Sequence, residues 1–279
     1  MSAAFEAFFL AADQGRAGQR FCIFHPAQSL APRGAVLYVH PFAEEMNKSR
    51  RMAALQSRAL AASGFAVLQI DLYGCGDSSG DFGDVSWEDW LADVMQAMRW
   101  LQRRADDAPL WLWGLRAGAL IAAEAAQRAG SAANFLFWQP AISGKVLVQQ
   151  FLRLKAAGAL ADGSAKAVME ATRAEIAAGR TIHVAGYQVP APLLVGLEAA
   201  ALNPPATAGG RVVWLEVATR ADPSLSPSSV TAIERWERSG FEVHGAAVPG
   251  PPFWQTTEIE DAPALVTTSK SLMLEPTIA

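Results

Sequence analysis

The sequence lacks the features that mark several large classes of protein. Its 279 residues include only two cysteines, Cys22 and Cys75, so no disulfide framework is indicated and a reducing cytoplasmic location is expected. No apolar run reaches the length of a membrane span, and the apolar start of the chain carries Glu6 and Asp13 but no basic stretch of a signal peptide. The 23 basic residues form no basic arm and the net charge is −4, which argues against nucleic acid as a partner.

What the sequence does contain is a steady alternation of short apolar runs and amphipathic runs. Strands are predicted at residues 33–43, 109–114, 134–140, 211–218 and 241–248, and in a run at 65–83 that breaks into a Gly-rich turn. Helices are predicted at residues 52–64, 86–107, 115–130 and 226–239. Such alternation predicts an α/β fold with a mostly parallel sheet covered by helices on both faces. Residues 143–192 break the pattern with an Ala-rich helical stretch, so we predict a core of residues 1–142 and 193–279 with a small helical cap inserted at 143–192.

Three motifs follow the predicted strands in order. The first is His40-Pro41-Phe42, the second is DLYGCGDS at residues 71–78, and the third is GLRAG at residues 114–118. Ligands bind at the carboxyl ends of the strands in sheets of this kind, so these loops are where a site is expected.

These motifs, in this order and with a cap after them, resemble the α/β-hydrolase superfamily over nearly the whole chain. Within it, the segments HPFAEEMNKSRR, DLYGCGDSSGDFG, WLWGLRAGAL and VPGPPFWQTTEI are similar to the proteins named exosortase A system-associated hydrolase, type 2. The resemblance implies hydrolysis of ester- or thioester-type acyl bonds, in association with exopolysaccharide and protein-sorting systems. It also implies a companion hydrolase as one partner.

The catalytic triad of the superfamily is incomplete in this sequence. The nucleophile elbow places Ser, Cys or Asp between two glycines, but here the central residue is Arg116. Asp222 can fill the acid position. The loop after the last strand, where a histidine is expected, offers Phe253 and Trp254, and none of the four histidines follows Val248.

The anion-stabilising part of the site is predicted to survive. The amides of Phe42 and Ala117 occupy the positions of oxyanion donors, and the start of the helix after the elbow favours negative charge. Together with the guanidinium of Arg116 they would hold a permanent anion such as a carboxylate or phosphate. Alternatively, Arg116 is neutralised in a buried ion pair, and at least one carboxylate among Glu44, Glu45 and Asp222 is expected within hydrogen-bonding reach of it.

Three functions are therefore open. The first is a hydrolase in which Glu44, Glu45 or His40 activates water; the second is a pseudo-enzyme that binds a small anionic or acyl ligand; the third is an interaction partner of a companion hydrolase or of a second copy. No cofactor or metal is expected. The predicted pocket wall comprises Trp138, Gln139, Phe253 and Trp254.

Overall fold

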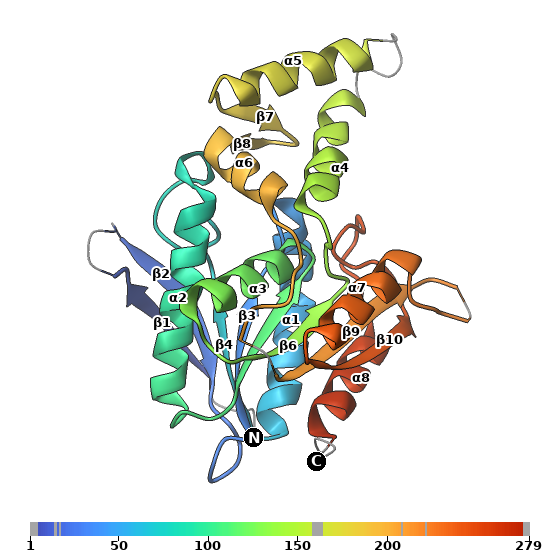
Figure 1. The fold of residues 1–279 in the computed structure, drawn as a ribbon. Coiled ribbons are helices and arrows are strands. Elements are labelled where there is room, and N and C mark those ends of the chain that lie inside the picture. Colours follow the sequence, from blue (N-terminus) through green and yellow to red (C-terminus); the bar gives the residue numbers. More distant parts are fainter. Residues whose placement is uncertain are drawn as a thin grey trace.

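One central sheet of eight strands organises the molecule (Figure 1). The structure is a computed structural model that describes residues 5–13, 16, 18–157, 164–207, 209–220 and 222–275. The strand order is β1-β2-β4-β3-β5-β6-β9-β10, with β1 and β2 antiparallel and the remaining six strands parallel. The strands are β1 (Glu6–Ala11), β2 (Gln19–His25), β3 (Gly34–Val39), β4 (Phe65–Ile70), β5 (Leu110–Leu115), β6 (Asn134–Trp138), β9 (Arg211–Ala218) and β10 (Glu242–Pro249).

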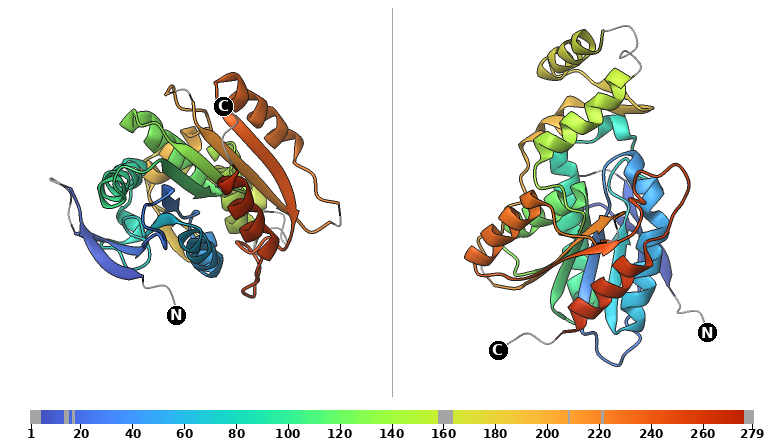
Figure 2. Two further views of the ribbon diagram at one scale, coloured as in Figure 1. Left: turned by 90° about the horizontal axis from the view of Figure 1, so that it is seen from below. Right: turned by 90° about the vertical axis from the view of Figure 1, so that its right-hand side faces the viewer.

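Helices cover both faces of this sheet, as the alternation predicted (Figure 2). One face carries α1 (Glu44–Ala62) and α8 (Pro263–Leu274), and the other carries α2 (Trp87–Arg104), α3 (Ala117–Ala129) and α7 (Pro227–Arg238). The central strands β3 and β5 are apolar because both of their faces are buried, and all six residues of each strand are buried. The predicted fold class is confirmed.

Local signals in the sequence set the limits of several helices. Ser86 caps α2: its side chain accepts a hydrogen bond from the amide of Asp89, whose side chain in turn accepts from the amide of Ser86. Acidic residues lie in the first turn of α2, and Arg103 and Arg104 lie in its last turn, as the helix dipole favours. Helix α3 ends at Gly130, which adopts the left-handed conformation with φ 58°.

Two parts of the core depart from the sequence-based assignment. The alternation predicts no strand before residue 33, yet the structure adds the antiparallel pair β1 and β2. In β2, Arg20 is 1% exposed, and its Nε donates to Oδ1 of Asp93 in α2 at 2.7 Å. The helix predicted at 52–64 is also wrong at its start, because α1 begins at Glu44 and so brings Glu44 and Glu45 into its first turn.

A cap lies over the carboxyl ends of the parallel strands, between β6 and β9 in the chain (Figure 1). It contains α4 (Gly144–Ala157), α5 (Ala165–Ala177), the hairpin of β7 (Ile182–Val184) and β8 (Tyr187–Val189), and α6 (Ala191–Ala199). The glycines at 158 and 163, which interrupt the Ala-rich stretch in the sequence, lie outside the described residues. Within the described part of the chain, no helix is long and apolar enough to cross a membrane.

Candidate functional site

The turn from β5 to α3 has the backbone of a nucleophile elbow with an arginine at its tip. Arg116 adopts φ 55° and ψ −116°, a conformation that is strained for any residue with a side chain. Hydrogen bonds hold it there: its amide donates to the carbonyl of Trp138 at 3.1 Å, and its carbonyl accepts from the amides of Ala119 and Ala141. The elbow therefore keeps its shape although its side chain cannot act as a nucleophile.

The two glycines around Arg116 are required by close packing. A Cβ atom on Gly118 would lie 2.1 Å from the carbonyl oxygen of Val39, and one on Gly114 would lie 2.5 Å from the amide nitrogen of Ala119. Only glycine allows β3, β5 and α3 to approach this closely. The spacing G-x-R-x-G thus preserves the scaffold of the elbow independently of its central side chain.

Arg116 is paired with a carboxylate, as predicted. Its Nε donates to Oε1 of Glu45 at 3.1 Å, and the two side chains are only 17% and 12% exposed. Its Cζ also lies 5.9 Å from the ring centroid of Trp254, within the range of a cation–π contact. Neither Nη atom of Arg116 hydrogen-bonds to any residue in the described ranges.

Glu45 has an unusual environment for a carboxylate. Its pKa is raised to about 7: burial is the main cause, the neighbouring Glu44 adds to the increase, and Arg116 opposes it. Oε2 of Glu45 is buried and has no hydrogen-bond partner among the described residues. The side chain is therefore close to half protonated at neutral pH and has one oxygen free to accept or donate a hydrogen bond.

Two adjoining cavities meet at Arg116 under helix α4. We call them the Glu45 cavity, of about 340 Å³, and the Glu216 cavity, of about 370 Å³. Both are lined by Arg116, Leu147 and Gln150. The Glu45 cavity adds Phe42, Glu44, Glu45, Lys48, Phe151, Leu154 and Gln255; the Glu216 cavity adds Gln139, Pro140, Ala141, Ile142, Ser143, Val146, Glu216, Ser226, Ser228 and Ser229.

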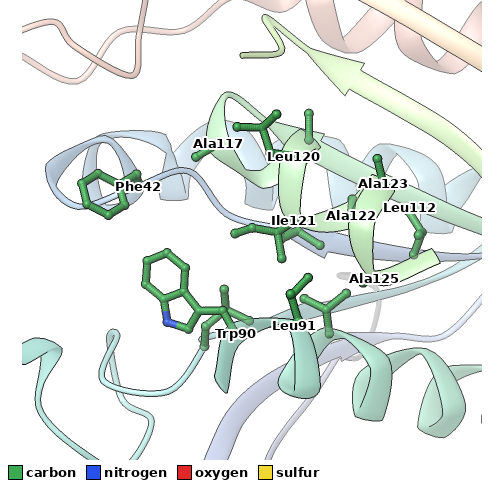
Figure 3. Packing of buried hydrophobic residues seen from close by; sticks show 14 of the residues in the cluster. Phe42, Trp90, Leu91, Leu112, Ala117, Leu120, Ile121, Ala122, Ala123 and Ala125 are labelled. Atoms are coloured by element: carbon green, nitrogen blue, oxygen red, sulfur yellow. The ribbon is translucent and has the colours of Figure 1, made fainter. Parts of the chain in front are cut away.

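Phe42 and Ala117 lie at the elbow, where the sequence placed the oxyanion donors. Figure 3 shows Phe42 close to Ala117 at the start of α3, with Trp90 beside them. The ring of Phe42 packs edge-on against Phe151 of the cap, with centroids 5.0 Å apart. Neither the amide of Phe42 nor that of Ala117 donates a hydrogen bond within the described part of the chain. Phe42 lines the Glu45 cavity, whereas Ala117 is fully buried and lines neither cavity.

His40 does not serve as a base in this arrangement. Its Nε2 accepts from the amide of Leu72 at 3.3 Å, which leaves the proton on Nδ1, and Nδ1 donates to the carbonyl of Pro41 at 2.8 Å. Burial lowers the pKa of His40 and keeps the ring neutral. The imidazole thus ties the end of β3 to the loop after β4.

The structure also corrects the placement of the acid and of the pocket wall. Asp222 is exposed and forms no ion pair with a described residue, so it does not reach Arg116. Trp138 and Phe253 are fully buried and pack edge-on against each other in the core under α8, so their assignment to the pocket wall is wrong. Gln139 does line the Glu216 cavity, and its Oε1 accepts from the amide of Val217 at 2.8 Å.

Sequence reasoning missed Glu216 and the residues of α4. Glu216 is buried in β9 and holds the N-cap residue of α7: it accepts from the amide of Ser226 at 2.6 Å and from the hydroxyls of Ser226 and Ser229. The sequence does offer one signal for Glu216, because it is a glutamate inside an otherwise apolar strand. Gln150 and Leu154 lie on α4, whose sequence gave no indication of which face meets the pocket.

The remaining histidines lie away from Arg116. His244 bonds to Glu242 at 2.8 Å in β10, beside a separate cavity of about 620 Å³ at the amino ends of the strands. His183 is exposed in β7, and His25 lies in β2. No histidine lines the Glu45 or Glu216 cavity within the described part of the chain.

We expect that fluorophosphonate probes will not label the protein. The probe needs a serine activated by a base, and the elbow has Arg116 with no described histidine beside it. Mass spectrometry of probe-treated protein measures the outcome. Stoichiometric labelling of a serine such as Ser143 or Ser228 would reveal a nucleophile that the described geometry does not contain.

No group of three or more His, Cys, Asp or Glu side chains in the described ranges is arranged to hold a metal ion. Beside Arg116, Glu45 is paired through Oε1, while Oε2 of Glu44 and Oε2 of Glu45 are buried without a described partner, so the chemistry of this site rests on the guanidinium and the Glu45 carboxyl.

Comparisons with known proteins identify the family and the fold. A family model described as serine aminopeptidase, S33, matches residues 31–174. Human Protein ABHD12B is 29% identical over 106 residues, which cover 38% of this chain and 28% of that protein, so the match spans little more than a quarter of the relative's length.

Among solved structures, Est1E from Butyrivibrio proteoclasticus with ferulic acid bound is similar with a TM-score of 0.65 at 15% identity, over 96% of this chain and 98% of that one. A thermostable carboxyl esterase from Bacillus coagulans, in complex with glycerol, is similar with a TM-score of 0.59 at 15% identity, over 88% and 90% of the two chains. At such identities the likeness shows the fold alone.

Proposed function

The chain belongs to the α/β-hydrolase family described as serine aminopeptidase, S33, and on that premise we propose that its site binds a small anionic ligand of acyl or ester type at Arg116. One observation carries the proposal: a guanidinium stands where the family needs a nucleophile, with both Nη atoms free of described partners beside two cavities. Arginine is well suited to carboxylates and phosphates because its N–H groups can pair with two oxygens at once.

The surroundings of Arg116 add to this preference for an anion. The amides of Phe42 and Ala117 have no partner among the described residues, and the amino end of α3 contributes its positive dipole. The two cavities are open and carry polar groups, which supports a ligand site over a vestigial pocket filled by side chains. We accordingly place the interaction-partner hypothesis, with a companion hydrolase or a second copy, below ligand binding.

Hydrolysis of ester or thioester bonds is the second candidate, and Glu45 is the observation that favours it. A carboxylate with a pKa of about 7 suits a general base at neutral pH, and its free Oε2 could take a proton from water. Arg116 and the two amides would then hold the oxyanion. The resemblance to exosortase A system-associated hydrolases favours ester-type substrates. The cytoplasmic location is likewise a proposal from the sequence.

One set of proteins distinguishes the two candidates: wild type, Arg116→Ser, Glu45→Gln and the control Arg128→Ser. Arg128 lies at the other end of α3 and pairs with Glu88 and Glu124, so it reports the loss of an arginine away from the site. Isothermal titration calorimetry with small carboxylates and inorganic phosphate measures binding, and p-nitrophenyl and thioester hydrolysis measures turnover.

We expect binding to wild type and to Arg128→Ser, at least tenfold weaker binding to Arg116→Ser because a charge-assisted contact is lost, and no turnover by any of them. Turnover by wild type that Glu45→Gln abolishes would instead establish the hydrolase. If neither carboxylates nor phosphate bind to wild type, the anion site is refuted.

A further inference from the structure

Helix α4 presents an apolar stripe to the two cavities. Val146 and Leu154 are 50% and 47% exposed, and with Gln150 between them they are spaced four residues apart on one face of the helix. Val146 lines the Glu216 cavity, Leu154 lines the Glu45 cavity, and Leu147 lines both. The stripe extends over about 12 Å, at 1.5 Å per residue, and passes above Arg116.

When Glu45 is ionised, the charges around the Glu45 cavity balance without a ligand. Glu44 and Glu45 contribute two carboxylates, and Lys48 and Arg116 contribute two cations. A bound monoanion therefore adds one uncompensated negative charge, and a bound dianion adds two. A carboxylate is thus preferred to a phosphate monoester at this cavity.

Glu45 can remove the negative charge that a bound anion adds, because its carboxylate can take up a proton. The ionisable groups that face it are Glu44 and Lys48 on its own helix and Arg116 at the elbow, whereas α4 contributes only uncharged side chains to the cavity. Tyr187 of the cap hairpin lies near Glu44. Burial raises the pKa of the Tyr187 phenol, and the negative charge of Glu44 raises it as well. Oε2 of Glu45 is buried without a described partner, so a ligand carboxylate beside Arg116 would face it directly.

Building on the proposed function, we infer that the ligand is a monocarboxylic acid with an apolar chain that lies along α4, and that Glu45 and the ligand share one proton beside Arg116. Two carboxylates next to one guanidinium cannot both remain ionised at low cost, so one of them takes up a proton. The proton comes from solvent, binds Oε2 of Glu45, and is donated in a hydrogen bond to the ligand carboxylate, whose second oxygen accepts from Nη of Arg116.

This arrangement makes the affinity depend on pH with a definite sign. Free Glu45 has a pKa of about 7, and an adjacent anion raises it further, so above pH 7 each binding event takes up close to one proton. The affinity then falls about tenfold for each pH unit in that range. Below pH 7 Glu45 is already protonated in the free protein, and the dependence levels off until the ligand itself is protonated.

Calorimetry on the full chain tests both parts. Acetate, hexanoate, decanoate and octyl phosphate are titrated at pH 6.5, 7.5 and 8.5, in Hepes and in Tris, whose different ionisation enthalpies reveal proton uptake. We expect affinity to rise with chain length among the acids, octyl phosphate to bind more weakly than hexanoate, and uptake of about one proton for each acid at pH 8.5.

Three variants separate the contributions. Glu45→Gln should still bind the acids, since its amide can donate to the carboxylate, but without proton uptake or pH dependence. Leu154→Ser should weaken decanoate severalfold and leave acetate unchanged. Val195→Ser is the control, because Val195 is 54% exposed on α6 and lies outside both cavity linings. It should leave the affinities for decanoate and acetate unchanged.

Each part of the proposal is contradicted by a different result. Binding that does not depend on chain length refutes the apolar groove. Binding of acids without proton uptake refutes the shared proton, as does pH dependence that persists in Glu45→Gln. Absence of binding by every acid and phosphate refutes the proposed function itself.

Discussion

Replacement of Arg116 by serine is expected to lower the free energy of unfolding by about 3 kcal/mol at pH 8 and by only about 1 kcal/mol at pH 5. At pH 8 the change leaves the Glu45 carboxylate buried without its cation and beside Glu44. At pH 5 Glu45 is already protonated, because its pKa is about 7, so the variant loses little more than one hydrogen bond. The cost should therefore grow as the pH rises through neutrality.

The raised pKa of Glu45 also makes the stability of the wild-type protein depend on pH. The pKa of Glu45 rises from 4.5 to about 7 on folding, so its contribution to stability is complete below pH 4.5 and is lost as the pH rises to about 7. By linkage the difference amounts to about 3 kcal/mol. Glu45→Gln should remove this dependence.

Urea denaturation of wild type, Arg116→Ser, Glu45→Gln and the double variant at pH 5 and pH 8 measures these effects as a double-mutant cycle. The double variant should recover most of the stability that Arg116→Ser loses at pH 8, since no charge is left buried. Equal losses at both pH values would show that Arg116 stabilises the fold through packing and that its charge contributes little.

A large effect of a single methyl group is expected at Gly118. In Gly118→Ala the new Cβ would lie 2.1 Å from the carbonyl oxygen of Val39 and 2.9 Å from that of His40, both backbone atoms that cannot move independently. We expect a loss of about 3 kcal/mol, or about 10 °C in Tm, because α3 must shift away from β3.

Gly130→Ala is the matched control for this change. Gly130 ends the same helix, has φ 58° and has no described atom within 4 Å of the position that a Cβ would take, so alanine there adds backbone strain without a clash. It should cost only about 1 kcal/mol. Differential scanning calorimetry compares the Tm values of Gly118→Ala and Gly130→Ala. Similar Tm values would mean that α3 moves away from β3 at little energetic cost and that close packing does not fix the elbow.

The sequence was sufficient for the six parallel strands of the sheet and for the existence of a charged site. Continuous apolar runs such as β3 and β5 can be recognised directly, and the rule that loops meet at the carboxyl ends of parallel strands brought Glu45 and Arg116 together. The first two strands were missed because Arg20 makes β2 look polar. Its burial depends on Asp93, a partner 73 residues away that no local pattern reveals.

The details of the site depend on the directions in which neighbouring side chains point, and short sequence patterns do not determine these directions. Glu44 and Glu45 are consecutive on α1 and point in directions about 100° apart, so the rotation of the helix decides which one meets Arg116. Phe253 and Trp254 are consecutive as well, and only Trp254 approaches the guanidinium. Asp222 follows β9 by a few residues, but its side chain is exposed to solvent.

The elbow also separates the chemistry of the site from the backbone shape of the turn. Its strained turn is held by Gly114, Gly118 and backbone hydrogen bonds, none of which involve the side chain at position 116. Every L-residue placed there meets the same backbone strain, whatever its functional group. A lineage can therefore exchange nucleophile, cation or inert side chain at this one position by single substitutions, with the rest of the scaffold unchanged and only Glu45 left to adapt.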